Sequence, residues 1–134
     1  MKGKFWKKAL PFLLTAMALA PTCSAAETDW KFVTNDGSDA ECYIDASRSW
    51  FDGKEGNGFT KVENRRTGYY VVYSLKFTDL GNGTFNALMA HGQVYDKSGN
   101  YVSADDGTTT NVIKAESTMG KVCNAIMGIK KKTE

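Results

Sequence analysis

The sequence predicts an α+β domain, an antiparallel meander sheet of about five or six strands with a C-terminal helix packed on one face. Three observations predict it. Residues 59–105 are rich in β-branched and aromatic residues and are interrupted by turn sequences, "DLGNG" and "DKSGN". Before them, "WKFVTNDGSDAECYID" has the pattern of strand, turn and strand. After Ser117 the apolar spacing changes to that of a helix.

The first 26 residues have the pattern of a secretory signal peptide, with four lysines, then the apolar run "ALPFLLTAMALA", then small residues before Ala26. The apolar run is shorter than the roughly 20 residues that a membrane-spanning helix needs. We therefore expect a signal peptide over residues 1–26, cleaved after Ala26 or, nearly as well, after Ala25. The remaining chain would have no transmembrane segment.

The net charge of the full chain, +2, depends on those four lysines. Residues 27–134 keep 13 Lys and Arg against 15 Asp and Glu, a formal charge of −2. We therefore expect no nucleic-acid partner. A chain of this length forms a single small domain, which we place over residues 27–134.

The first two predicted strands lie on either side of the turn "NDGSD". Trp30 and Phe32 are the apolar part of the first strand, and Cys42 and Ile44 share one face of the second. Asp45 or Ser47 can then cap a helical turn. The segment "FDGKEGNG", residues 51–58, is typical of a mobile glycine-rich loop.

The next predicted strand alternates between a more apolar and a more polar face. Tyr69, Val71, Tyr73, Leu75 and Phe77 lie on the first face, whereas Tyr70, Val72, Ser74, Lys76 and Thr78 lie on the second. Residues 84–95 should pair back across "DLGNG", a third strand should begin at residue 101, and "FTKVEN" should be a further neighbour.

The predicted helix has an apolar stripe with i, i+3, i+4 and i+7 spacing, made of Met119, Val122, Cys123 and Ile126. Ser117 or Thr118 can cap its start. The lysines at 130–132 are expected at its C-terminal end, where cations oppose the helix dipole. The glycines at 120 and 128 lower its intrinsic stability.

Catalytic and metal-binding patterns are absent from the sequence. His91 is the only histidine, and no G-x-S-x-G, CxxC or HxxxH pattern accompanies it. A strand histidine with no catalytic role therefore explains it better than a general base does. We expect no enzyme activity, no cofactor and no metal ion.

Two surface features could bind a partner. One is aromatic and contains Trp50 and Phe51, beside the predicted glycine-rich loop, and Tyr70 on the outer strand face. The other is basic and contains Lys61, Arg65, Arg66, Lys130, Lys131 and Lys132. A satellite hydrophobic cluster and a solvated run of charge are the alternative interpretations of these two features.

The cysteines lead to a structural prediction. Signal cleavage would remove Cys23 and leave Cys42 and Cys123. Two cysteines in an exported chain favour one disulfide. The strand and helix patterns place both side chains in the layer between sheet and helix, so we predict a Cys42–Cys123 disulfide.

The ordered set of motifs "WKFV", "CYIDASRSW", a Tyr-rich strand, "VYDKSGNYVSADD" and "VCNAI" after an export signal resembles the surface-adhesin protein E family. Tyr43, Ile44 and Asp45 match its Tyr-hydrophobic-Asp strand end, residues 95–99 its Tyr-Asp-x-x-Gly turn, and Cys123 its last cysteine. One departure concerns the internal cysteine of the family, which lies near the end of a central strand. This chain has "TFNALMA" there, without a cysteine.

The resemblance implies a small sheet packed against a helix. It also implies a non-enzymatic, adhesin-like binding protein of a Gram-negative bacterium, located in the periplasm or at the outer-membrane surface. Its partner would be a host matrix or serum protein, or a component of the bacterial envelope. The alternative is a periplasmic inhibitor or immunity protein that blocks an enzyme active site, with "FDGKEGNG" as the inserting loop.

Overall fold

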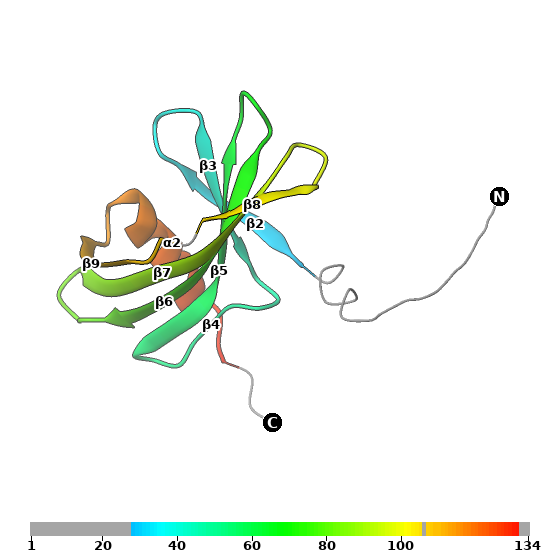
Figure 1. Ribbon diagram of the computed structural model, residues 1–134. Helices are drawn as coiled ribbons and strands as arrows, with labels where there is room; N and C mark the ends of the chain where they lie inside the picture. Colours follow the sequence, from blue (N-terminus) through cyan, green and yellow to red (C-terminus); the bar gives the residue numbers. More distant parts are fainter. Residues whose placement is uncertain (1–27, 106, 132–134) are drawn as a thin grey trace, which may run out of the picture.

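The computed structural model describes residues 28–105 and 107–131 (Figure 1). The predicted signal peptide at 1–26, with Cys23, lies outside the described residues, and so does Lys132. The described chain contains eight strands and one helix, namely β2 (Trp30–Asn35), β3 (Ala40–Asp45), β4 (Trp50–Phe51), β5 (Glu55–Asn64), β6 (Tyr70–Asp79), β7 (Thr84–Tyr95), β8 (Tyr101–Asp105), β9 (Thr109–Lys114) and α2 (Thr118–Met127).

The eight described strands belong to one open antiparallel sheet with the order β2-β3-β5-β6-β7-β8, in which β4 also pairs with β5 and β9 with β7. The α+β class and the helix on the sheet are therefore confirmed. The prediction of five or six strands was wrong, because the sheet has eight. The long central strands explain the difference, since along the chain β5 pairs with β4 and then with β3, and β7 pairs with β9 and then with β8.

A β-bulge marks the point where β7 changes its neighbour. Residues 84–89 pair with β9 and residues 92–95 pair with β8. At this point the register with β6 shifts, so that His91 and Gly92 both lie opposite Tyr73. His91 has a φ of 57°, the left-handed conformation, which is uncommon for residues other than glycine. Bulges bend a strand and redirect a side chain, and here the redirected side chain is the single histidine.

The hydrophobic core lies between α2 and one face of the sheet (Figure 1). The helix contributes Val122, Cys123 and Ile126, whose side chains are fully buried. The sheet contributes Cys42, Ile44, Leu75, Phe77, Phe85 and Ala87. The predicted apolar stripe is thus the buried face of the helix. Ser117 is the N-cap and accepts a hydrogen bond from the Gly120 N–H at 3.1 Å, as one of the two predicted caps.

Lys130 and Lys131, which follow α2, do not belong to its last turn, contrary to the prediction. The helix ends at Met127, with Gly128 as its C-cap. Beyond it, the Phe51 N–H donates to the Ile129 carbonyl at 2.7 Å and the Lys131 N–H donates to the Phe51 carbonyl at 3.3 Å. The last described residues therefore form a parallel bridge to β4, which takes the backbone hydrogen bonds that a longer helix would have used.

The predicted glycine-rich loop is largely regular structure. Only a tight turn separates β4 from β5, and Gly56 and Gly58 lie within β5. A Cβ atom on Gly56 would lie 2.1 Å from the Phe77 ring, and one on Gly58 would lie 2.2 Å from the Ser49 hydroxyl. These glycines therefore allow close packing and do not mark a mobile loop. The helical turn expected after Asp45 is also absent, and a short non-helical turn takes its place.

Cys42 and Cys123 are both buried in the one core cluster, as the two sequence patterns predicted. Both are free thiols in the structure, so the predicted Cys42–Cys123 disulfide is not formed there. Burial raises the pKa of Cys42 and raises that of Cys123 to about 12. In this state each cysteine acts as a small apolar core residue.

We expect Gly120→Ala to destabilise the protein although alanine has the higher helix propensity. A Cβ atom at this position would lie 2.0 Å from the Lys114 carbonyl oxygen, which belongs to the chain entering the helix. Overpacking against backbone should lower the free energy of unfolding by about 2 kcal/mol, measured by urea denaturation. Gly128→Ala is the matched control, since its nearest contact is an ordinary 3.4 Å, and a loss no larger at Gly120 than at Gly128 would contradict the close packing.

The state of the two core cysteines can be read by thiol titration of protein that carries Cys23→Ser and is purified without reductant. We expect no reaction in the folded protein at pH 8 and two thiols per chain after unfolding, because burial keeps both groups protonated and inaccessible. Finding no thiols after unfolding would show instead that the disulfide forms.

Candidate functional site

The sheet face opposite α2 carries a hollow of about 460 Å³ that crosses β5, β6 and β7. We name it the aromatic groove and define it by Trp30, Arg48, Phe59, Tyr70, His91 and Tyr95. Thr28, Val72, Gln93 and Gly99 complete its lining. The strand alternation that turns Leu75 and Phe77 toward the helix turns Tyr70 and Val72 into this hollow.

Aromatic rings form the side of the groove at β6 and β7. The rings of Tyr70 and Tyr95 are stacked with centroids 5.1 Å apart. Tyr101 packs edge-on against Tyr95, with centroids 6.1 Å apart. The Tyr95 hydroxyl donates a hydrogen bond to the Gln93 side chain at 2.8 Å. The groove therefore offers flat apolar surfaces with polar atoms at their margins.

The ammonium group of Lys61 makes cation–π contacts with aromatic rings from different strands beside the groove. Its Nζ lies 5.2 Å from the ring centroid of Trp30, 4.7 Å from that of Tyr43 and 5.1 Å from that of Tyr70. Glu63 balances its charge at 3.7 Å. The positive charge of Lys61 is therefore already matched within the protein, and these cation–π contacts order the rings.

A buried carboxylate fixes the opposite side of the groove. The side chain of Asp45 is fully buried at the end of β3. It accepts hydrogen bonds from the Asp29 N–H at 2.9 Å, from the Ser47 N–H at 3.0 Å and from the Ser47 hydroxyl at 2.6 Å. The Arg48 Nε–H donates to its second oxygen at 2.6 Å, which completes an ion pair. Both oxygens of this buried charge are thus satisfied.

Arg48 is held between this carboxylate and an aromatic ring. Its guanidinium carbon lies 4.1 Å from the ring centroid of Phe59. Within the described part of the chain, Nε is the only side-chain atom of Arg48 that donates a hydrogen bond. A guanidinium has five N–H donors, so the terminal nitrogens can bind a ligand without breaking the contacts that position them.

The pKa values of two groups reflect this environment. Burial acts to raise the pKa of Asp45, but the hydrogen bonds from Ser47, Asp29 and Arg48 outweigh it, so the pKa is lowered and the carboxylate stays charged. Burial raises the pKa of Tyr70, and the nearby Tyr95, Glu63 and Asp96 raise it further. The Tyr70 hydroxyl therefore keeps its proton and can donate a hydrogen bond.

His91 lines the groove from the β7 bulge. Its side chain is exposed, and within the described residues it makes no hydrogen bond. The imidazole is consequently available to a ligand in the groove. Sequence reasoning gave this residue no role, because nothing in the local pattern shows that the strand bulges there.

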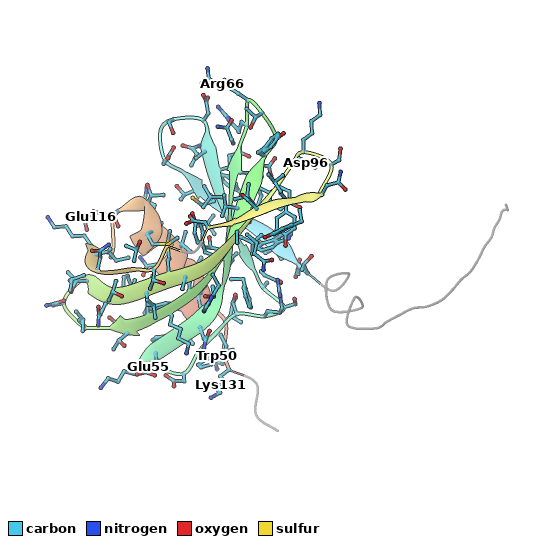
Figure 2. The ribbon with its side chains drawn as sticks, viewed as in Figure 1. Trp50, Glu55, Arg66, Asp96, Glu116 and Lys131 are labelled. Carbon is cyan, nitrogen blue, oxygen red and sulfur yellow. The ribbon has the colours of Figure 1, made fainter. Side chains whose placement is uncertain are left out.

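Most of the partner-binding residues predicted from sequence lie at two distant ends of the sheet. Trp50 and Lys131 lie close together at one end, and Arg66 lies at the other (Figure 2). The Lys131 ammonium is 4.4 Å from the Trp50 ring centroid. Phe51 packs into the core, stacked on Phe77 with centroids 6.0 Å apart, and Lys130 bridges to it. Phe51 is therefore structural, and the predicted basic feature is not one patch.

Arg65 and Arg66 each pair with a nearby carboxylate. Arg66 contacts Asp39 at 2.8 Å, and Arg65 contacts Glu41 at 3.7 Å. Both arginine side chains are largely exposed, at 54% and 79%. Exposed pairs of this kind are typical of a solvated surface, which is the alternative that the sequence left open.

Sequence reasoning missed most of the aromatic groove. It named Tyr70 as a candidate partner-binding residue but gave no binding role to Trp30, Arg48, Phe59 or Tyr95. The alternation in β5 and β6 could have placed Phe59 and Tyr70 on one face. The position of Arg48 could not have been found in this way, because it lies in a turn.

Among the residues that the structure describes, no three His, Cys, Asp or Glu side chains are grouped in a way that could hold a metal ion. The same residues include no helix that is long and apolar enough to cross a membrane. In comparisons with known proteins, no family model, curated protein or solved structure matched the chain.

The buried ion pair gives a prediction for Asp45→Asn. We expect the free energy of unfolding at pH 7 to fall by about 3 kcal/mol, because the substitution leaves the Arg48 charge without its buried partner. Denaturant unfolding measures the loss. Asp52→Asn, which alters an exposed carboxylate that also accepts two backbone hydrogen bonds, should cost much less.

The same pair gives a pH dependence. Because folding lowers the pKa of Asp45, its charge stabilises the fold above the unfolded value of about 3.9, and that contribution is lost as the pH falls through the lower folded value. The stability gap between wild type and Asp45→Asn should therefore be full at neutral pH and narrow below about pH 4. A gap of constant size across this range would contradict the assignment.

Proposed function

We propose that this chain is a non-enzymatic, exported binding protein that holds a macromolecular partner on the aromatic groove. The observation that carries the proposal is the buried Asp45 carboxylate, which fixes Arg48 over Phe59 at the margin of the groove. A buried charge is costly to a small domain unless it is fully hydrogen-bonded. Here its hydrogen bonds position a cation that faces a ligand-sized hollow.

The side chains of the groove are held in position before a partner binds, and this favours binding. An arginine and several aromatic rings are the side chains most often found at the centre of binding surfaces. Lys61 holds the rings and Asp45 holds Arg48, so little side-chain entropy would be lost when a partner binds. The proposal thus moves the contact surface from the two sequence-predicted features to the sheet face opposite α2.

The resemblance to the surface-adhesin protein E family supports the class of partner. It favours a host matrix or serum protein, or an envelope component, as the molecule that is bound. Asp45 belongs to the Tyr-hydrophobic-Asp element that carries the resemblance, and this aspartate orients Arg48. The basic and aromatic residues at the ends of the sheet would then be peripheral to the contact.

Binding assays with immobilised protein test this proposal in two arms, one with host serum and matrix proteins and one with extract of the bacterial envelope. We expect one arm to give a retained partner whose capture falls at least about tenfold with Tyr95→Ala, as for an interface hot spot. Tyr69→Ala removes a ring that lies next to Tyr70 in sequence but outside the groove, and it should leave capture unchanged. Equal capture by wild type and Tyr95→Ala would contradict the proposal.

A further inference from the structure

We propose that the aromatic groove holds a carboxylate-bearing sugar residue of the partner, with the sugar ring against the aromatic side chains and its carboxylate on Arg48. This inference rests on the proposed function and specifies which chemistry the groove recognises. It follows from the charge of the groove, from the state of Arg48 and from the position of the groove within the sheet.

The charge of the lining favours an acidic ligand. Its ionisable groups are the guanidinium of Arg48, the imidazole of His91 and tyrosine hydroxyls, and no described lining residue is a carboxylate. The nearby acids are engaged within the protein, because Asp45 lies behind Arg48, Glu63 pairs with Lys61, and Asp96 accepts hydrogen bonds from the backbone of its own turn. A ligand carboxylate on Arg48 would therefore meet donors, and no carboxylate, among the lining residues.

The fixed geometry of the Arg48 side chain suits a carboxylate ligand. Nε is anchored on Asp45 and the guanidinium plane is supported by Phe59, so the terminal N–H groups keep one orientation. Parallel N–H groups of a guanidinium match the two oxygens of a carboxylate. A lysine at this position would supply charge without that planar fork.

The position of the groove favours a sugar over an extended peptide. Apart from Trp30 at the start of β2, an edge strand, the strand residues that line the groove lie on β5, β6 and β7, central strands whose backbone groups pair with one another. An extended peptide gains affinity by pairing with a free sheet edge, which these central strands do not offer. Recognition must come from side chains, and flat rings bordered by the Gln93 amide and tyrosine hydroxyls suit the C–H face and hydroxyls of a pyranose.

His91 supplies the second donor. Its φ of 57° is a conformation that glycine adopts without steric cost, yet the chain has an imidazole there. The bulge turns this imidazole into the groove from β7, whereas Arg48 reaches the groove from the turn after β3. Strained residues of this kind gather at ligand sites.

Titrations followed by NMR test the inference, with the Arg48 Nε–H resonance of isotope-labelled protein as the reporter. The acidic probes are the methyl glycosides of glucuronic acid, galacturonic acid and N-acetylneuraminic acid. The neutral probes are the methyl glycosides of glucose and galactose, and acetate tests for a bare anion. We expect at least one acidic glycoside to shift the resonance and to bind about tenfold more tightly than every neutral probe and acetate.

Variants connect the affinity to the groove. Arg48→Lys, followed through the side-chain amide resonances of Gln93 because the Arg48 reporter is lost, should weaken binding of that glycoside about tenfold, since it keeps the charge and loses the fork. His91→Gly should weaken it several-fold while its thermal midpoint stays equal or rises, because glycine relieves the left-handed backbone. Because the thermal midpoint of His91→Gly does not fall, its weaker binding cannot be caused by a loss of folded protein. Tyr69→Ala should bind as wild type does.

The inference is overturned if no acidic glycoside shifts the Arg48 resonance, or if neutral glycosides or acetate bind as tightly as the acidic ones. It is also overturned if His91→Gly and Arg48→Lys bind the acidic glycoside as wild type does. If capture of a macromolecular partner still depends on Tyr95 in those cases, the groove remains the binding surface and only the ligand chemistry is wrong. If capture does not depend on Tyr95, the proposed function itself is contradicted.

Discussion

The organisation of this protein depends on the hydrogen bonds that the fully buried carboxylate of Asp45 accepts. Its two oxygens gather the entry to β2, the turn after β3 and the side chain of Arg48. Removing such a charge from water is unfavourable unless each oxygen is hydrogen-bonded, so the chain around it has little freedom. The same hydrogen bonds that close the turn therefore point a guanidinium group at the aromatic groove, so one residue serves the fold and the binding that we propose.

The two faces of the sheet have separate roles. One face and α2 enclose the core, where Val122, Cys123 and Ile126 are fully buried. The other face has no helix over it within residues 28–105 and 107–131, and it is ordered by cation–π contacts and stacked rings, with Lys61 among Trp30, Tyr43 and Tyr70. Because the core is complete without the second face, that face can carry aromatic residues for a partner at little cost to folding.

Much of the fold could be predicted from local pattern, whereas little of the candidate site could. The strands over 84–95 and from 101 were found because period-two alternation and turn residues are local signals, and the Ser117 cap was found for the same reason. The loop prediction for 51–58 was wrong because glycine has two uses, and only the close approach of Phe77 and Ser49 shows that packing is the one that applies. The lysines after α2 were misplaced because the chain had a competing partner in β4.

The sequence by itself determined the α+β class, the apolar faces of strand and helix, and the placing of Cys42 and Cys123 in one core layer, because each follows from residue spacing along a regular element. Only the tertiary structure decided that β5 and β7 each pair with two successive strands along one side, and that His91 lies in a bulge. It alone also brought Arg48, Phe59, Tyr70 and Tyr95 around one hollow. The physical reason is that these arrangements depend on pairing between segments that are far apart in the chain, and the spacing of residues within one segment carries no record of such pairing.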